Sequence, residues 1–309
     1  MITVIGFNTA IDRLVRLDTL RPGKVSRALD EQEFPGGKGL HVAQSIAALG
    51  ERVQLVGLVD AAHRNLIGRL MCERGVLFHG IEVAENLRTC IALQDANGQI
   101  TEILGQGPLL GSAQQEALLR AFRRGVDDSE LVILSGSLPR GFPTTTYAEL
   151  ATYVRDAGKR CLVDASGELM QHALQAAPFL VKPNRDEISE LLGRPVTDLA
   201  AAADAARELH RSGVAMPVVT MGALGAVAVD AHAVWHAELP LAQVRNSVGS
   251  GDCLLAGMAV GMARGMNLEE TLRLGTACGA ANAQGEETGF VERRTVEALL
   301  SQVRVRRLG

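Results

Sequence analysis

The stretch Ser247-Val248-Gly249-Ser250-Gly251-Asp252 is followed directly by the apolar run Cys253-Leu254-Leu255-Ala256-Gly257-Met258-Ala259. Two glycines around a small residue allow a tight turn, and the apolar run predicts a helix that begins there. The first N–H groups of a helix lack partners within it and together bind anions. Asp252 adds a carboxylate that suits removal of a proton beside a transferring phosphoryl group. The stretch predicts a phosphotransfer site, although four such residues are equally typical of a turn with an Asp cap.

The composition limits the class of protein. The chain has 309 residues, enough for one large domain with a small subdomain, and its net charge of −4 comes from interspersed acidic and basic residues. This pattern argues against a basic face for nucleic acid or an anionic membrane and favours a small-molecule partner. Aromatic residues make up only 3%, which is typical of helices packed closely on a sheet. We expect one α/β domain over residues 1–309.

The cysteines and the first residues indicate the compartment. The five cysteines are scattered without a Cys-x-x-Cys pair, which argues against a disulfide framework and a structural zinc site. Asp12 and Arg13 come too soon after the first apolar residues for the core of a signal peptide. The sequence has no uninterrupted apolar run long enough to span a bilayer. These features predict a cytoplasmic protein that does not bind membranes.

Predicted strands and helices alternate along most of the chain. Strands are expected at 3–5, 53–58, 131–134, 161–164, 179–181 and 217–220. Helices are expected at 39–49, 112–124, 144–157, 186–192 and 199–211, with a capping box of Ser112 and Gln115 opening the second. The alternation predicts a mostly parallel sheet covered by helices on both faces.

Two stretches interrupt this alternation. Residues 13–34 lack a helical period, and residues 89–104 read as a hairpin with Asn97-Gly98 at the turn. Together they predict a small β-sheet that projects from the main domain. It is either a lid over a site or an extended edge of the main sheet, and the sequence leaves both open.

A second glycine-rich loop, Pro35-Gly36-Gly37-Lys38-Gly39, precedes the first predicted helix. Neither Lys24 nor Lys38 is followed by the Ser or Thr of a P-loop, so P-loop nucleotide chemistry is disfavoured. The first strand leads to Gly6-Phe7-Asn8-Thr9 rather than to Gly-x-Gly-x-x-Gly, which argues against a dinucleotide site.

Six motifs in order carry a family resemblance: Asn8-Thr9-Ala10-Ile11-Asp12, Gly36-Gly37-Lys38-Gly39, Ser135-Gly136-Ser137-Leu138-Pro139, Val181-Lys182-Pro183-Asn184 with Glu187, Thr220-Met221-Gly222-Ala223-Leu224-Gly225-Ala226, and Val248 to Asp252. The whole chain resembles the ribokinase-like (PfkB) carbohydrate kinases, most closely the branch of 1-phosphofructokinases and tagatose-6-phosphate kinases. The resemblance implies a ribokinase-like α/β three-layer sandwich with a mostly parallel central sheet. It also implies a small β lid over the sugar site, with segments near 13–34 and 89–104.

By this resemblance, the chain transfers the γ-phosphoryl group of ATP to a sugar hydroxyl. Asp252 would be the general base, and the N–H groups of Gly249, Ser250 and Gly251 would form the anion hole. On the nucleotide side, Asn184 and Glu187 would lie near the ATP phosphates, with Glu187 reaching Mg²⁺ mainly through water. Without the resemblance we would favour a simple helix cap made by these two residues. The remaining nucleotide-side residues are Lys182, Thr220, Gly222, Gly225 and Asn282.

The segment from Asn282 to Gly289 could also supply carbonyls to a monovalent cation such as K⁺. On the sugar side, the resemblance assigns hydroxyl binding to Asp12. It assigns the phosphate already present on the substrate to Lys24 and Arg88. The alternatives are an exposed turn residue for Asp12 and solvated surface charges for the two cations. Gly36, Gly37, His41 and Ser137 complete the expected sugar site.

Three positions depart from the family branch, which usually has Pro at Thr9, Asn at His41 and Asn at Cys90. His41 is the sharpest departure, because its ring is larger than an amide and can become charged near neutral pH. The departures leave the identity of the acceptor sugar open.

Three functions are therefore weighed. The first is a kinase for a phosphorylated ketohexose of the fructose 1-phosphate or tagatose 6-phosphate type. The second is a kinase for an unphosphorylated sugar or nucleoside, and the third is a sugar-phosphate-binding regulator without catalysis. An exposed lid sheet also predicts a homodimer formed by two lids.

Overall fold

The central sheet of the computed structural model, which describes residues 1–308, contains ten strands in the order β14-β13-β12-β11-β10-β9-β8-β1-β4-β5. All pairings from β5 to β11 are parallel, and the three beyond β11 are antiparallel. The predicted mostly parallel sheet is confirmed. The strands are β1 (Ile2–Gly6), β4 (Val53–Asp60), β5 (Val76–Val83), β8 (Leu131–Ser135), β9 (Arg160–Asp164), β10 (Leu180–Val181), β11 (Met216–Thr220), β12 (Ala226–Val229), β13 (Val234–Glu238) and β14 (Arg304–Leu308).

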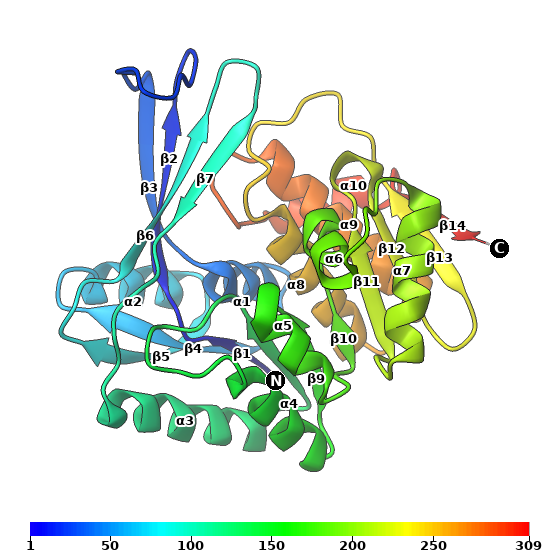
Figure 1. Ribbon diagram of the computed structural model, residues 1–309, viewed down its shortest axis with the longest axis horizontal. Coiled ribbons are helices and arrows are strands. Elements are labelled where there is room, and N and C mark those ends of the chain that lie inside the picture. Colours follow the sequence, from blue (N-terminus) through cyan, green and yellow to red (C-terminus); the bar gives the residue numbers. More distant parts are fainter. Residues whose placement is uncertain (309) are drawn as a thin grey trace.

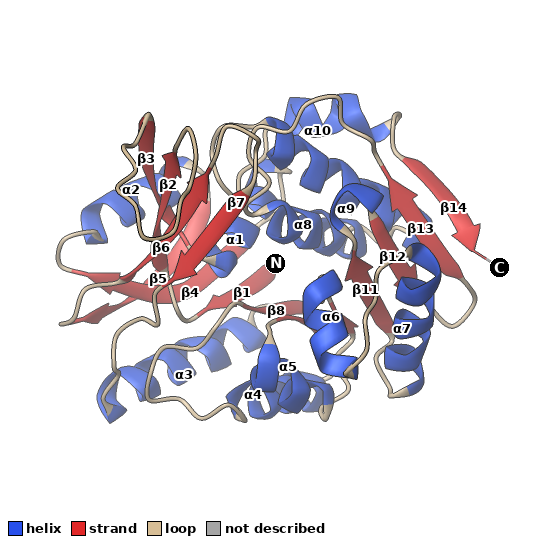
Figure 2. Cartoon of the chain, turned by 45° about the horizontal axis from the view of Figure 1, so that its top comes forward, coloured by secondary structure: helices blue, strands red, loops and turns tan. Residues whose placement is uncertain are grey.

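Helices cover both faces of this sheet, as Figure 2 shows. One group comprises α1 (Lys38–Ala48), α2 (Arg64–Glu73), α8 (Ser250–Ala263), α9 (Leu268–Gln284) and α10 (Arg293–Leu300). The other comprises α3 (Ser112–Asp127), α4 (Thr146–Asp156), α5 (Gly167–Leu174), α6 (Arg185–Leu192) and α7 (Leu199–Arg211). The middle strands β1, β4 and β8 are buried along their whole length between these layers, which explains their continuous apolar sequences.

Four strands form a separate sheet that projects from the body (Figure 1). Its order is β3-β2-β6-β7, with β2 (Ala10–Arg16), β3 (Asp30–Gly36), β6 (Arg88–Gln94) and β7 (Ile100–Leu104). β6 and β7 form the predicted hairpin, and Gly98 in its turn has φ of +78°. Both irregular stretches of the sequence therefore meet in one sheet, which we call the lid. It is not an extension of the ten-stranded sheet.

One local prediction is wrong. The helix predicted at 112–124 forms as α3, but Gly111 is its N-cap and no capping box of Ser112 and Gln115 is present there. The Gln115 side-chain amide instead donates to the carbonyls of Leu110 and Gly141, at 3.0 and 3.3 Å. The loop that carries Gly141 is distant in sequence and binds this side chain, so the local sequence pattern could not predict the contact.

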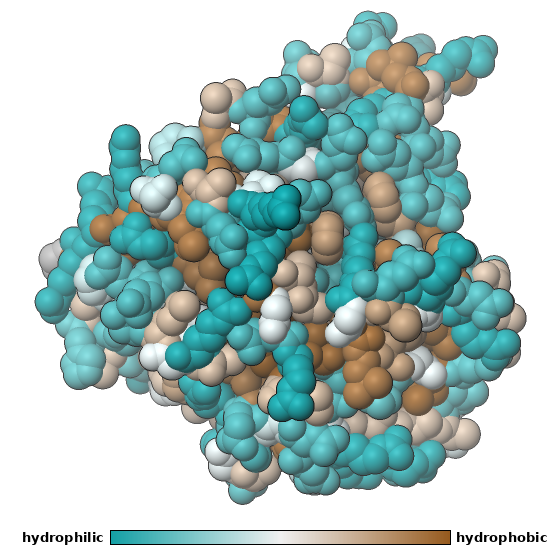
Figure 3. All heavy atoms as spheres, turned by 180° about the vertical axis from the view of Figure 1, so that it is seen from behind, coloured by the Kyte–Doolittle hydropathy of each residue, from teal (hydrophilic) through white to brown (hydrophobic). Residues whose placement is uncertain are grey.

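The surface carries two features relevant to partners. Within residues 1–308, no helix has both the length and the apolar character needed to cross a membrane. Seen from behind, much of the surface is hydrophilic, and apolar atoms show in several places, including the far end of the lid (Figure 3). Val25 and Leu29, in the connection between β2 and β3, are 92% and 71% exposed.

Candidate active site

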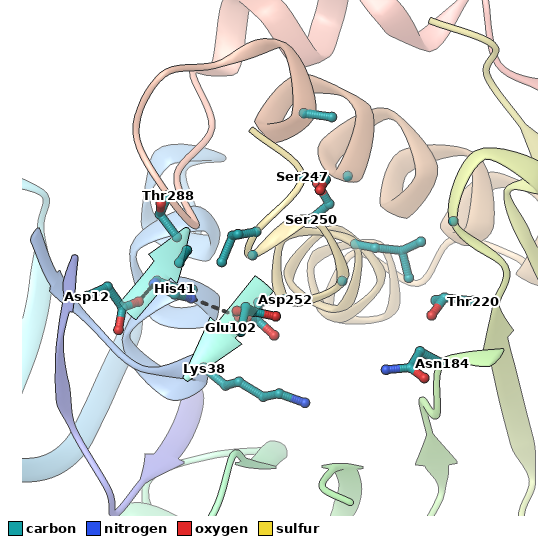
Figure 4. Close-up of a pocket in the computed structure, with 18 of the residues that line it drawn as sticks. Asp12, Lys38, His41, Glu102, Asn184, Thr220, Ser247, Ser250, Asp252 and Thr288 are labelled. Carbon is teal, nitrogen blue, oxygen red and sulfur yellow. Dashed lines mark hydrogen bonds and ion pairs between the residues drawn. The ribbon is translucent and has the colours of Figure 1, made fainter. Parts of the chain in front are cut away.

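A cavity of about 940 Å³ lies at the carboxyl ends of the parallel strands, between the lid and the first turn of α8 (Figure 4). This edge of an open α/β sheet is where ligands usually bind, because loops and helix N-termini converge there. Fifteen of the expected site residues line the cavity: Asp12, Gly37, His41, Arg88, Ser137, Lys182, Asn184, Glu187, Thr220, Gly222, Gly225, Gly249, Ser250, Gly251 and Asp252. The structure thus brings together residues from both ends of the sequence.

Two expected sugar-site residues lie elsewhere. Lys24 is exposed in the connection between β2 and β3, outside the cavity lining. This connection follows the far end of the lid, so one copy of the chain does not bring Lys24 to the cavity, and its expected role at the substrate phosphate stays a prediction. Gly36 is not part of the cavity lining, but its lack of a side chain leaves room for the Asp12 carboxylate, which a Cβ there would overlap.

The first turn of α8 forms at the predicted place. Gly249 is the N-cap with φ of +80°, in the left-handed region that favours glycine. The N–H of Ser250 donates to the Ser247 carbonyl at 3.2 Å, so Ser250 shapes the turn with its backbone. Gly251 and Asp252 follow within the first helical turn, whose N–H groups have no partner inside the helix. This turn is suited to bind an anion beside the Asp252 carboxylate.

Asn282 differs from its expected place. It is fully buried on α9, outside the cavity lining. Its side-chain amide donates to the carbonyls of Asn246 and Val248 and to Ser250 Oγ, at 3.3, 2.9 and 2.9 Å. Its Oδ1 accepts the N–H of Gly289 at 2.8 Å. The side chain of Asn282 thus fixes the anion-binding turn from behind, and its expected role on the nucleotide side stays a prediction.

Two lysines and a buried aspartate form a cluster that the sequence analysis did not assign. Asp164, at the end of β9, is fully buried, and its two carboxylate oxygens lie 3.2 Å from Lys38 Nζ and 3.3 Å from Lys182 Nζ. Burial would raise the pKa of Asp164, but Lys182 and Lys38 outweigh burial and lower it. Burial would lower the pKa of Lys38, and the carboxylates of Asp164, Glu187 and Asp252 raise it. The Lys38 ammonium group is thus held charged at the cavity.

This cluster supplies positive charge beside the anion-binding turn. A Cβ on Gly251 would lie only 3.1 Å from Lys182 Nζ, so the ammonium group approaches the turn closely because residue 251 is glycine. Fixed positive charge at this place would stabilise the equatorial oxygens of a transferring phosphoryl group. The available signal was an acidic residue at the end of a predicted buried strand, which points to the ligand-binding edge.

Asn184 and Glu187 form the helix cap considered from the sequence. The Asn184 side chain accepts the N–H groups of Asp186 and Glu187, while Glu187 Oε2 accepts the N–H of Asn184 at 2.8 Å, which completes a capping box on α6. Both residues also line the cavity. Glu187 Oε1 lies 3.7 Å from Lys38 Nζ. The cap fixes the residues, and their remaining polar atoms are available to a ligand.

The donor set fits a magnesium ion that arrives with phosphates. Among residues 1–308, no group of three or more His, Cys, Asp or Glu side chains could hold a metal ion by itself. Mg²⁺ usually retains water and binds through one or two carboxylates plus substrate phosphates. Glu187, at the cavity wall beside the cap of α6, matches that requirement.

In the motif from Thr220 to Ala226, Gly225 serves the backbone. Gly225 has φ of +84°, and a Cβ there would overlap the Ala237 carbonyl, so this turn can pack on β13 only with glycine. Thr220 ends β11 beside Asn184, with which it forms an isolated parallel bridge. These residues form the cavity wall opposite the lid, as Figure 4 shows for Thr220 and Asn184.

The sugar side is built from lid strands and α1. Arg88 donates from Nε to the Asn8 carbonyl at 3.0 Å and from Nη1 to the Gly105 carbonyl at 3.3 Å. These bonds hold the guanidinium at the base of the lid, where it lines the cavity. Ser137 Oγ accepts the side-chain amide of Asn8 at 2.9 Å. Arg88 thus adds a positive charge to the sugar side.

His41 lies between the two acidic residues expected to handle the acceptor. Its Nδ1 is 2.8 Å from Asp252 Oδ2, and its Nε2 is 3.0 Å from Asp12 Oδ2. Burial would lower the pKa of His41, but Asp12 and Asp252 outweigh burial and raise it to about 10. Burial would raise the pKa of Asp12, which the hydrogen bond and charge of His41 lower instead. The sequence analysis did not foresee this contact.

An anion-binding helix N-terminus beside a buried carboxylate and two lysines, all facing a projecting sheet, defines a kinase that phosphorylates a small molecule. The model of the pfkB family carbohydrate kinases matches residues 1–294. The chain belongs to this family and is an ATP-dependent sugar kinase.

Similar proteins agree with this assignment over the full length. The chain is 32% identical to 1-phosphofructokinase of Bacillus subtilis over 308 residues, which is 100% of both chains. Phosphofructokinase-2 of Escherichia coli, solved with substrates and products, has a TM-score of 0.88 at 26% identity and covers 97% of this chain and 98% of its own. That enzyme has also been solved with potassium and as an inhibited tetramer. Ribokinase of Thermotoga maritima, with a TM-score of 0.78 at 23% identity and coverage of 97% and 99%, shows the same fold.

Proposed function

We propose that this chain transfers the γ-phosphoryl group of ATP to a hydroxyl of a phosphorylated ketohexose. The observation that carries the proposal is Arg88, fixed at the base of the lid in the same cavity as Asp12 and Asp252. A guanidinium placed there would bind a phosphate already present on the acceptor. The full-length similarity to a 1-phosphofructokinase supports the same substrate class.

The proposed reaction assigns one task to each group. The acceptor oxygen attacks the γ-phosphorus, the bond from that phosphorus to the bridging oxygen of ADP breaks, and the hydroxyl proton passes to Asp252. The N–H groups of the α8 first turn and the ammonium groups of Lys38 and Lys182 stabilise the charge on the transferring group. Asp12 accepts hydrogen bonds from acceptor hydroxyls. Holding both reactants in one cavity supplies much of the acceleration.

The cofactors in this proposal are ATP and Mg²⁺. Glu187 would hold the metal through water beside the cap of α6, and the bound metal would neutralise phosphate charge. A monovalent cation such as K⁺ near the anion-binding turn is also proposed, with carbonyls of residues 282–289 as ligands. The potassium complex of the E. coli enzyme supports this part. Replacing K⁺ by tetramethylammonium should then lower activity.

The lid suggests how Lys24 could take part. Its far end exposes the apolar side chains of Val25 and Leu29 next to this lysine. A homodimer that pairs two lids would bury those side chains and could bring Lys24 to the cavity of the partner copy. Sedimentation of the protein with and without Val25→Asp tests this assembly.

A screen of ADP release tests the proposed reaction. Fructose 1-phosphate, fructose 6-phosphate and tagatose 6-phosphate are compared with fructose, tagatose, ribose and adenosine, and Asp252→Asn serves as the blank. Turnover that strongly favours a phosphorylated acceptor is the expected result. Preference for a free sugar or nucleoside would establish the second candidate, and ATP consumption absent with every acceptor would favour a regulator.

A further inference from the structure

His41 connects the acceptor side of the cavity to the transfer side. Its Nδ1 makes a hydrogen bond with Asp252 Oδ2 at 2.8 Å, and its Nε2 lies 3.0 Å from Asp12 Oδ2, an ion-pair contact without hydrogen-bond geometry. The ring is 4% exposed, and Figure 4 shows it between the two carboxylates. Asp12 Oδ1 is buried and has no hydrogen-bond partner among the residues the structure describes. Asp12 thus uses one oxygen for the ring and keeps a buried acceptor for a ligand.

Glycine backbone fixes the orientation of this ring. A Cβ on Gly289 would overlap the His41 ring, and a Cβ on Gly249 would lie 3.6 Å from Nδ1. Gly289 is itself held, because Asn282 Oδ1 accepts its N–H at 2.8 Å and its carbonyl accepts Gln44 Nε2 at 2.7 Å. The ring therefore fits a cradle in which a side chain at Gly289 would displace it, while a Cβ on Gly249 would only touch it.

The charges around the ring favour a cation on it. Two carboxylates, each within 3.0 Å of the His41 ring, would repel one another without a positive group between them. Other charges lie on neighbouring elements and act on the same cluster. The charged groups that face it are Asp12 from β2, Asp252 from α8, Lys38 from α1, Arg88 from β6 and Glu102 from β7.

We propose that His41 is a positioning residue: with a proton on each ring nitrogen, it holds Asp12 and Asp252 in one orientation and so couples acceptor binding to proton removal. The inference rests on the proposed function for its kinetic consequence, but not for the state of the ring. An Asn at this place would carry both of its N–H donors on one nitrogen and has no charge, whereas the imidazole presents one nitrogen to each carboxylate. We call this arrangement of His41 between Asp12 and Asp252 the clamp. It also places an imidazole in the cavity wall on the acceptor side, which makes His41 a determinant of acceptor choice.

The state of the ring can be measured without turnover. Long-range ¹H–¹⁵N spectra report the protonation of each of the seven histidines, and His41→Asn identifies the His41 signals. We expect a doubly protonated ring at pH 7.5 that titrates near pH 10. Its titration should move to lower pH in Asp12→Asn and in Asp252→Asn. A neutral ring at pH 7.5, or a titration that ignores both substitutions, would overturn the inference.

Kinetics then test the positioning role. With fructose 1-phosphate as the probe, His41→Asn and His41→Gln should lower kcat/KM by about 10- to 100-fold, because misplaced groups lose their alignment. The loss of activity that accompanies deprotonation near pH 10 should disappear from the kcat/KM profile of both variants. Thermal unfolding and circular dichroism identify any variant that fails to fold, and the spectra of the unsubstituted protein remain a test in that event.

The chain provides a matched control. His63 Nδ1 lies 2.8 Å from Asp60 Oδ1, another histidine–aspartate pair, but outside the cavity. His63→Asn should leave the pH profile and the acceptor KM unchanged. If His41→Asn gives the same profile and constants as this control, His41 is not a positioning residue. If the unsubstituted protein turns over no acceptor while the ring is doubly protonated, the proposed function fails and the state of the ring stands.

Discussion

The two ends of the cavity are built differently. At the transfer end, the first turn of α8 presents backbone N–H groups, and Asp164 holds Lys38 and Lys182 beside them. At the acceptor end, side chains from β2, α1 and β6 meet: Asp12, His41 and Arg88. Backbone groups keep their chemistry when side chains change, whereas an acceptor pocket made of side chains changes with each substitution. The anion-binding turn should therefore tolerate side-chain substitutions better than the acceptor end does.

The three departures from the family branch support this contrast. Thr9 is buried away from the cavity, where its Oγ accepts the N–H of Leu58 at 2.9 Å, so it serves the fold. Cys90 lines the cavity, and burial raises the pKa of its thiol to about 11, which keeps it neutral at physiological pH. His41 also lines the cavity and carries the clamp. The two departures that reach the site both lie on the acceptor side.

The largest expected effect falls on the transfer end. Asp252→Asn removes the proton acceptor and should lower kcat by roughly 10²- to 10⁴-fold, with the acceptor still bound. Isothermal titration with a sugar phosphate and single-turnover ADP release measure the two parts separately. The matched control is Asp198→Asn, because Asp198 caps α7 outside the cavity and Asn caps equally well. Wild-type turnover in Asp252→Asn would remove Asp252 as the base.

The next effect belongs to the acceptor end. Arg88→Ala removes a charge-assisted bond worth about 1.5–3 kcal/mol, so KM for a phosphorylated acceptor should rise about 10- to 100-fold. KM for ATP should stay the same, because Arg88 lies on the lid side. The measurement compares initial rates with fructose 1-phosphate and with fructose. An equal loss on both acceptors would show that Arg88 does not bind the substrate phosphate.

The smallest effect separates a metal contact from a helix cap. Glu187→Gln keeps the capping box but removes the carboxylate charge, so half-maximal activity should need about 2- to 10-fold more Mg²⁺. Asn267 and Glu270 form the same capping box on α9, outside the cavity lining. Glu270→Gln is therefore the control, with unchanged dependence on Mg²⁺. Equal Mg²⁺ curves for the two variants would assign Glu187 to the cap alone.

Sequence patterns predicted the parts of the fold that depend on local repetition. The alternating strands and helices, the hairpin at Asn97-Gly98 and the helix after Gly251 all formed, because periodicity and turn chemistry act over a few residues. Gln115 illustrates the limit, since its partner loop approaches only in the folded chain. Lys24 illustrates the same limit for the site, because the position of this residue depends on the length and direction of the lid strands β2 and β3.

The amino-acid sequence by itself determined the class of this protein: an α/β sugar kinase with an anion-binding turn at Gly249 and a carboxylate at Asp252. These features come from contiguous residues whose geometry is set by glycine conformations and helix N–H groups. Only the tertiary structure decided which charges neighbour one another. Asp12, His41 and Asp252 are far apart along the chain. The packing of β2, α1 and α8 nevertheless brings both carboxylates within 3.0 Å of the His41 ring. Because these groups are buried, little solvent remains to screen their charges, and their electrostatic interactions are strong.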